Sequence, residues 1–268
     1  MGNDERMRAQ SWADAAPQPT PSPTVSADRA VGSFRRTTSF HSRRAALSPG
    51  QQQTWERLWP ELGYVARPPH DSDAPGEPLD TRAWFGRDAP LVLEIGCGTG
   101  TSTLAMAQSE PDVDVVAVEV YRRGLAQLLC AIDREDVSNI RLIRGDAVDV
   151  LQQLLAPGSL SGVRVFFPDP WPKARHHKRR LLQPDTVALI ADRLQVGGVL
   201  HAATDHPGYA DQIAEVGDAE PRLSRLDAHA EPTISVVRPT TKYESKAHDA
   251  GSAVTELIWE RRSERSRP

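Results

Sequence analysis

Residues 91–100, Leu91-Val92-Leu93-Glu94-Ile95-Gly96-Cys97-Gly98-Thr99-Gly100, decide the fold of this chain. The first five are apolar except for Glu94, and they predict a short buried strand. The alternating glycines predict a tight turn after that strand, and residues 101–108 read as a helix. A strand, a glycine-rich turn and a helix in this order are typical of an α/β fold.

Strands and helices continue to alternate after this unit. The apolar residues of the helices recur at i, i+3, i+4 and i+7, the spacing of one buried helical face. The predicted elements are strands over 113–120, 140–143, 163–167 and 199–203, and helices around 54–62, 125–132, 148–155, 184–194 and 209–216. Strands this apolar between amphipathic helices favour a mostly parallel sheet with helices on both faces.

Each of the five predicted strands ends at or near a carboxylate. In a sheet of this class the ligand lies beyond the carboxyl ends of the strands. One such acid is commonly a helix cap, but five on one edge indicate a site. The five acids are Glu94, Glu119, Asp146, Asp169 and Asp205.

The glycine-rich turn points to the kind of cofactor. Gly96, Gly98 and Gly100 are spaced G-x-G-x-G, whereas the dinucleotide fingerprint places its third glycine one residue later. Glu94 directly precedes the turn and would repel a pyrophosphate. A cofactor with a sulfonium and an ammonium group, S-adenosylmethionine, is favoured instead.

Two further acids support an adenosine pocket. Glu119, at the end of the next strand, has the position of an acid that accepts hydrogen bonds from both ribose hydroxyls. Asp146, after the third strand, is placed to accept from the adenine amine. Taken singly, both acids could cap helices, and a nicotinamide site remains the weaker alternative.

The most informative stretch for the substrate is Asp169-Pro170-Trp171-Pro172-Lys173-Ala174-Arg175-His176-His177-Lys178, followed by Arg179 and Arg180. The two prolines restrict the backbone on both sides of Trp171, so this corner should be rigid. A rigid acid beside an aromatic plane can hold a guanine by stacking and by accepting its N1–H and amine protons. The alternative is a tight turn with Trp171 buried as core.

Positive charge is local in this chain, because the formal net charge is −4 and no overall positive field attracts a nucleic acid. The run after Pro172 contains five Lys and Arg residues and no acid, which favours a docking surface for a polyanion over a solvated face. A second basic segment, residues 34–53, interleaves Phe34 and Phe40 with arginines. It is a candidate RNA contact or an ordinary linker; its arginines are Arg35, Arg36, Arg43 and Arg44.

The composition divides the chain into four parts. Residues 1–33 are rich in Pro, Ala and Ser and are expected to form a disordered tail, because they cannot bury a core. The basic segment 34–53, one α/β domain over 54–263 and a C-terminal tail over 264–268 follow.

No metal site and no membrane segment are expected. Cys97 and Cys130 are the only cysteines, and neither they nor the histidines have the spacing of metal ligands. Two cysteines without a disulfide pattern suggest reduced thiols. No stretch approaches the roughly 20 apolar residues of a membrane span, and the chain starts without an apolar signal core. These features predict a cytoplasmic protein.

Four stretches resemble, in order and spacing, the bacterial tRNA (guanine-N7-)-methyltransferase family. They are Leu93-Glu94-Ile95-Gly96, residues 166–180, Thr204-Asp205 with Tyr209, and Thr241-Lys242-Tyr243-Glu244. The resemblance covers about residues 35–262, and Asp169 to Arg180 is its most specific part. It implies a Rossmann-like S-adenosylmethionine-dependent methyltransferase fold and methylation of a guanine in the variable loop of tRNA.

The resemblance also implies roles for individual residues. Asp169 is the expected catalytic residue. The expected cofactor-binding residues are Glu94, Gly96, Gly98, Glu119, Asp146 and Asp169. The expected substrate-binding residues are Lys173, Asp205, Thr241, Lys242, Tyr243 and Glu244, and the expected RNA contacts are Arg175, His176, His177, Lys178, Arg179 and Arg180. Cys97 and Thr99 stand where the family more often has Phe and Met.

The expected activity is therefore transfer of a methyl group from S-adenosylmethionine to N7 of a guanine in tRNA. A small-molecule methyltransferase would share the fold and the pocket, but has no use for the cationic run. A noncatalytic RNA-binding module would keep that run, but has no need for acids around a glycine-rich turn. The sequence leaves the oligomeric state, monomer or homodimer, open.

Overall fold

The computed structural model describes residues 46–66, 77–226, 232–238 and 253–263. The chain divides into two units, residues 1–36 and 37–268, and every described residue belongs to the second unit. The expected tails, most of the basic segment 34–53 with its four arginines, and Thr241 to Glu244 lie outside the described residues.

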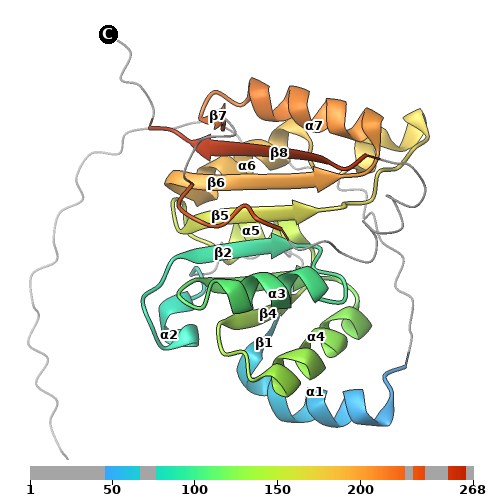
Figure 1. Cartoon of the computed structure of the whole chain (residues 1–268), viewed down its shortest axis with the longest axis vertical. Coiled ribbons are helices and arrows are strands. Elements are labelled where there is room, and N and C mark those ends of the chain that lie inside the picture. Colours follow the sequence, from blue (N-terminus) through green and yellow to red (C-terminus); the bar gives the residue numbers. More distant parts are fainter. Residues whose placement is uncertain (1–45, 67–76, 227–231, 239–252, 264–268) are drawn as a thin grey trace, which may run out of the picture. The chain divides into compact units, whose positions relative to one another are not determined.

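An eight-stranded sheet forms the centre of this unit, in the order β1-β4-β3-β2-β5-β6-β8-β7 (Figure 1). Strands β1 to β6 pair in parallel, and β8 runs antiparallel to β6 and β7. The strands are β1 (Gly63–Val65), β2 (Leu91–Ile95), β3 (Asp114–Glu119), β4 (Ile140–Arg144), β5 (Leu160–Phe166), β6 (Leu194–Thr204), β7 (Leu223–Arg225) and β8 (Thr255–Arg261).

Helices cover both faces of the sheet, because its central strands are buried on both sides. On β3, Val116 and Val118 belong to one apolar cluster, and Val115 and Ala117 belong to another. The first cluster includes residues of α5, α6 and α7, and the second includes residues of α1, α3 and α4. The helices are α1 (Pro49–Leu62), α2 (Thr81–Phe85), α3 (Thr101–Ser109), α4 (Arg122–Glu135), α5 (Ala147–Gln153), α6 (Pro184–Arg193) and α7 (Pro207–Ala219), with a 3-10 helix, η1 (Ala174–Arg179).

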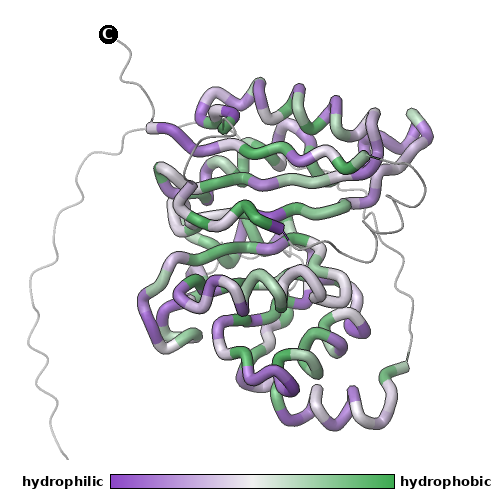
Figure 2. The backbone as a smooth tube through the Cα atoms, viewed as in Figure 1, coloured by the Kyte–Doolittle hydropathy of each residue, from purple (hydrophilic) through white to green (hydrophobic). Residues whose placement is uncertain are grey.

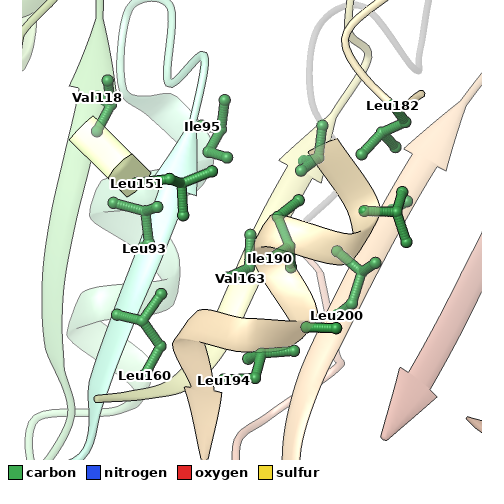
Figure 3. Packing of buried hydrophobic residues seen from close by; sticks show 14 of the residues in the cluster. Leu93, Ile95, Val118, Leu151, Leu160, Val163, Leu182, Ile190, Leu194 and Leu200 are labelled. Carbon is green, nitrogen blue, oxygen red and sulfur yellow. The ribbon is translucent and has the colours of Figure 1, made fainter. Parts of the chain in front are cut away.

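The larger cluster fixes the strands that carry the site. Figure 2 shows hydrophobic residues along the central strands, and Figure 3 shows Leu93 and Ile95 of β2, Val163 of β5 and Ile190 of α6 among its members. Each side chain of this kind stabilises the fold by about 1.5–3 kcal/mol when it is fully buried. The carboxyl ends of β2, β3, β4 and β5 are therefore held side by side at one edge of the sheet.

The predicted fold class, a mostly parallel sheet with helices on both faces, is confirmed. Strands β1, β7 and β8 were not predicted. Strand β8 does alternate, with Leu257 and Trp259 buried and their neighbours more exposed, but it is antiparallel and lies beyond the alternating strand–helix pattern. Phe167, expected in a strand, lies just outside β5 with a φ of 50°.

Helix α1 begins earlier than the sequence predicted. Ser48 caps it by accepting a hydrogen bond from the Gln51 backbone, and the Gln51 side chain accepts one from the Ser48 backbone. Pro49 occupies the first helical position, where its missing N–H costs nothing. The domain boundary expected between residues 53 and 54 therefore falls inside a helix.

Candidate cofactor and substrate site

A cavity of about 280 Å³ opens at the carboxyl edge of the sheet, where a ligand was expected. Three of the predicted acids line it: Glu119 after β3, Asp146 after β4 and Asp169 after β5. The other lining residues are Ile95, Gly96, Val118, Val120, Tyr121, Gly145, Ala147, Phe166, Phe167, Pro168, Trp171, Arg179 and Leu181. The cavity thus combines an acidic wall with apolar and aromatic surface.

The glycine-rich turn forms one side of the cavity and requires its glycines. Gly96, Gly98 and Gly100 have φ angles of 76°, 56° and 77°, in the left-handed region that other residues rarely adopt. The turn also packs closely on α4, since a Cβ on Gly124 would lie 2.1 Å from the Gly98 carbonyl oxygen. Gly96 and Gly98 were expected to bind the cofactor. Gly96 lines the cavity, and Gly98 fixes the turn.

Glu119 holds the turn against the end of β3. Its Oε2 accepts a hydrogen bond from the Gly98 N–H at 3.0 Å, and its Oε1 accepts from the N–H groups of Val120 at 2.7 Å and Tyr121 at 3.0 Å. Burial raises the pKa of this carboxyl above its ordinary value, and the three N–H groups oppose the shift. Oε1 accepts two hydrogen bonds and Oε2 accepts one, so Oε2 keeps acceptor capacity for a ligand in the cavity.

Glu94, in β2 just before the turn, is buried and does not line the cavity. Its side chain is buried, and burial raises its pKa to about 7, with Arg164 and Thr103 opposing the shift. Its Oε2 has no hydrogen-bond partner among the described atoms. A buried carboxylate oxygen of this kind favours a cationic or hydrogen-bonding group nearby. Of the four acids expected to bind the cofactor, Glu119, Asp146 and Asp169 line the cavity and Glu94 does not.

Asp146 has two roles in the structure. It caps α5, because its Oδ1 accepts a hydrogen bond from the Val148 N–H at 2.9 Å, and it also lines the cavity. The helix-cap interpretation and the ligand interpretation are thus compatible at this position. A cap of this type contributes about 1 kcal/mol to stability.

The corner after β5 is strained. Phe167 and Trp171 have φ angles of 50° and 43°, values that are rare for bulky residues and cost about 1–3 kcal/mol each. Trp171 is half-buried and lines the cavity, so it is not simply a core residue. Asp169 is exposed at the cavity mouth. The strained segment places an acid and an aromatic ring at the same opening.

The basic run forms η1 beside this corner. Lys173, Arg175 and Lys178 are exposed, whereas the Arg179 guanidinium lies 5.0 Å from the centre of the Trp171 ring. The His176 ring lies 5.8 Å from the same ring, and desolvation followed by the surrounding cations lowers its pKa. His177 is half-buried. The exposed cations therefore lie next to the acid and the ring.

Arg180 departs from the sequence expectation. Its side chain is buried and donates hydrogen bonds to the Pro170 and Gly208 carbonyl oxygens at 2.8 and 3.0 Å, and to Gln212 Oε1 at 2.7 Å. It also lies 4.7 Å from the Tyr209 ring centre. Because these internal partners occupy it, Arg180 is a brace between the corner and α7 and is not accessible to an RNA phosphate.

Two other predicted positions lie near the site. Asp205 is exposed at the end of β6 and does not line the cavity. Tyr209, on α7, accepts a hydrogen bond from the Leu182 N–H at 3.1 Å, and burial raises its pKa to about 12. Thr241 to Glu244 fall outside the described residues.

Sequence reasoning missed several cavity residues. Tyr121, Ala147 and Pro168 each lie within two residues of a predicted acid, so the strand ends themselves were a signal for them. Phe166 and Phe167 were read only as a strand end. Their place in the cavity wall depends on how the chain turns after β5, and the spacing of apolar residues in the sequence does not indicate this turn.

The cavity suits S-adenosylmethionine in its chemistry. Carboxylates at the ends of β3 and β4 can accept from the hydroxyl and amine groups of an adenosine, and apolar side chains such as Ile95 and Val118 can contact its rings. The buried Oε2 of Glu94, which has no hydrogen-bond partner among the described atoms, would be stabilised by a cationic group next to it. Among the described residues, no group of three or more His, Cys, Asp or Glu could hold a metal, and no helix is long and apolar enough to cross a membrane.

The fold and the site define a methyltransferase. Residues 88–257 match the family model described as "Putative methyltransferase". Among solved structures, the 16S rRNA (adenine(1408)-N(1))-methyltransferase from Catenulisporales acidiphilia is similar at 16% sequence identity, with a TM-score of 0.46. The similarity covers 70% of this chain and 93% of that one.

Close relatives narrow the class to one family. The tRNA (guanine-N(7)-)-methyltransferase of Mycobacterium avium (strain 104) is 66% identical over 262 residues, which cover 98% of this chain and all of that protein. The protein of the same name from Mycolicibacterium gilvum (strain PYR-GCK) is 72% identical over 233 residues, 85% of this chain and 87% of that one. The chain belongs to the tRNA (guanine-N(7)-)-methyltransferase family.

Proposed function

We propose that this protein transfers the methyl group of S-adenosylmethionine to N7 of a guanine in the variable loop of tRNA, forming 7-methylguanosine. The observation that carries the proposal is the opening of one cavity between an acidic wall and the Asp169–Trp171 corner, with exposed cations directly beside it. The names of the close relatives agree with this activity.

The cofactor would occupy the inner part of the cavity. Glu119 lines the cavity and would accept from the ribose hydroxyls through Oε2, which accepts one hydrogen bond from the chain, that of the Gly98 N–H. Asp146 would accept from the adenine amine, and the turn at Gly96 and Gly98, together with Glu94 at the end of β2, would hold the methionine end. When bound, the cofactor supplies a methyl group activated by its positively charged sulfur.

The residues at the mouth would hold the guanine. Its N7 is a lone-pair acceptor without a proton, so the reaction needs no strong general base. The bound cofactor would supply its methyl group to this lone pair and would keep the electron pair of the S–C bond. Asp169 would accept from the N–H groups of the purine edge and stabilise the positive charge that develops on the ring, while Trp171 lies beside the base.

The tRNA would be held by charge next to the cavity. Lys173, Arg175 and Lys178 are exposed on and next to η1, and Arg179 is held beside Trp171. Unstacking a guanine costs a few kcal/mol, which phosphate contacts offset. Lys173, Asp205 and Thr241 to Glu244 remain proposed guanosine-binding positions on the basis of the family resemblance.

The direct test is product identification. The purified protein is incubated with unmodified tRNA and methyl-labelled S-adenosylmethionine, and the tRNA is then digested to nucleosides. The label should be found in 7-methylguanosine from the variable loop. Label in another nucleoside, or in a small molecule and not in tRNA, would contradict the proposal. A tRNA with adenine at the target position serves as the matched control substrate.

A further inference from the structure

An extended segment far along the chain is attached to the strand that leads to the site. Residues 232–238, which we call the strap, run alongside β5 (Figure 1). Near the start of β5, Ile234 packs closely against Gly162. A Cβ added to Gly162 would lie 2.2 Å from the Ile234 Cδ1. The strap therefore lies directly on the strand.

Polar contacts fix the middle of the strap. The Ser235 N–H donates to Glu110 Oε1 at 2.8 Å, and Arg164 of β5 donates to the Ser235 carbonyl oxygen at 3.2 Å. Arg164 also forms a buried ion pair with Glu110 at 2.5 Å. The strap is thus tied to the strand itself and to the residue that follows α3.

Arg238 ends the strap at the cavity wall. Its side chain is almost fully buried, and its guanidinium lies 5.5 Å from the Phe166 ring centre and 5.1 Å from that of Phe167. Both phenylalanines line the cavity, and Phe167 has the strained φ of 50°. A planar cation over two aromatic rings restrains them in place.

The Arg238 guanidinium pairs with Glu256 of β8, and Glu256 in turn contacts His201 of β6. Arg238 donates to Glu256 Oε1 at 2.9 Å, and Glu256 Oε2 lies 2.9 Å from His201 Nε2. The His201 ring in turn meets the Phe166 ring edge to face, 4.9 Å between centres. The four side chains close a ring of contacts around the end of β5.

We propose that Arg238, held by Glu256, is a positioning residue for methyl transfer. It fixes the exit of β5, and so sets the place of Asp169, two residues after Phe167, relative to the cofactor. This inference rests on the proposed function. A strained backbone persists only when its surroundings fix it, and misplacement by about 1 Å can cost 100-fold in rate.

The experiment compares Arg238→Met with a matched control, Arg225→Met. Arg225 is also ion-paired, to Asp218 at 2.8 Å, and lies 5.4 Å from the Trp259 ring centre, but it lies on β7 away from the cavity. Arg238→Met should lower kcat about 10- to 100-fold, with little change in KM for tRNA. Arg225→Met should leave kcat unchanged. Glu256→Gln, a milder substitution, should act in the same direction as Arg238→Met.

Hydrogen exchange provides a readout that does not depend on the reaction. The Phe167 N–H donates to the Ala203 carbonyl oxygen at 2.8 Å and should be protected. In Arg238→Met and Glu256→Gln its exchange should accelerate about tenfold or more, and in Arg225→Met it should not. The double variant Arg238→Met/Glu256→Gln should lose no more rate than Arg238→Met alone, because one contact carries both effects.

The outcomes separate the two proposals. Unchanged exchange at Phe167 in both variants overturns the positioning role, and so does faster exchange with unchanged kcat. A kcat loss explained by a smaller folded fraction also overturns it. A wild-type protein that produces no 7-methylguanosine contradicts the proposed function instead, and the exchange result then still reports whether Arg238 fixes the strand end.

Discussion

Asp169 is the residue on which the proposed methyl transfer depends most. It is exposed at the cavity mouth beside Trp171, where a bound base would lie. A carboxylate there can offset a positive charge developing on the base, whereas an amide cannot. The effect of changing it should therefore appear in the transition state more than in tRNA binding.

The substitution Asp169→Asn should lower the single-turnover rate of methylation about 100-fold. The dissociation constant for tRNA should change little, because the proposed phosphate contacts of η1 are not altered. Rates are measured at saturating cofactor, and tRNA affinity is measured separately by titration. Unchanged turnover, or a loss confined to tRNA affinity, would refute the role of Asp169.

Glu94 should make stability depend on pH. Burial raises its pKa to about 7 from an ordinary value of 4.5, so the folded chain holds this proton more tightly than the unfolded chain does. Its favourable contribution is therefore complete below about pH 4.5 and is lost as the pH rises to about 7, a loss of about 3 kcal/mol.

The variant Glu94→Gln has no such proton to release. Its free energy of unfolding, measured with denaturant in the absence of cofactor, should change less between pH 5 and pH 8 than that of the wild type. The same pH dependence in both proteins would show that Glu94 does not carry the effect.

At the scale of elements, η1 carries the exposed Lys178, a proposed tRNA contact, and is followed directly by the buried Arg180. Replacement of exposed Lys178 by Ala should reduce the slope of log association constant for tRNA against log salt concentration by about 0.7–0.9, the effect of one lost phosphate contact. Arg180→Met should leave this slope unchanged and lower the free energy of unfolding by about 2–4 kcal/mol, because its three buried hydrogen bonds are lost. A smaller salt slope in Arg180→Met, with an unchanged slope in Lys178→Ala, would show that Arg180 contacts the RNA.

Adding one methyl group to α4, by Gly124→Ala, should lower both the stability of the fold and the affinity for the cofactor. Gly124→Ala would normally stabilise a helix by about 1 kcal/mol, but here the new Cβ would lie 2.1 Å from the Gly98 carbonyl oxygen. We expect the free energy of unfolding to fall by about 1–3 kcal/mol and cofactor affinity to fall with it. Gly50→Ala in α1, where nothing lies within 4 Å, is the control and should be neutral or slightly stabilising.

At the scale of the whole molecule, the cofactor should stabilise the fold. S-adenosylmethionine at 100 times its dissociation constant should raise the free energy of unfolding by about 2.7 kcal/mol. NAD at the same concentration should leave the unfolding midpoint unchanged, since the acidic cavity disfavours a pyrophosphate. Stabilisation by NAD alone would favour the nicotinamide alternative.

Much of the architecture was predictable because apolar periodicity and strand order determine it. The central strands, and the acids at the ends of β3, β4 and β5, follow from local pattern alone. The burial of Arg180 was not predictable, since its partners on α7 lie about 30 residues away in sequence. The same holds for Arg238, whose contacts join β5, β6 and β8.

The position of β8 in the sheet has a consequence for biosynthesis. In the described part of the chain β7 pairs with β8 and with no other strand, and the fully buried Trp259 of β8 packs against Gly217 of α7. A nascent chain can therefore assemble β1 to β6 during translation, but this end of the sheet waits for residues 255–261, which are made after the other strands of the sheet. Premature termination before residue 255 should leave an open sheet margin that chaperones or proteases would recognise.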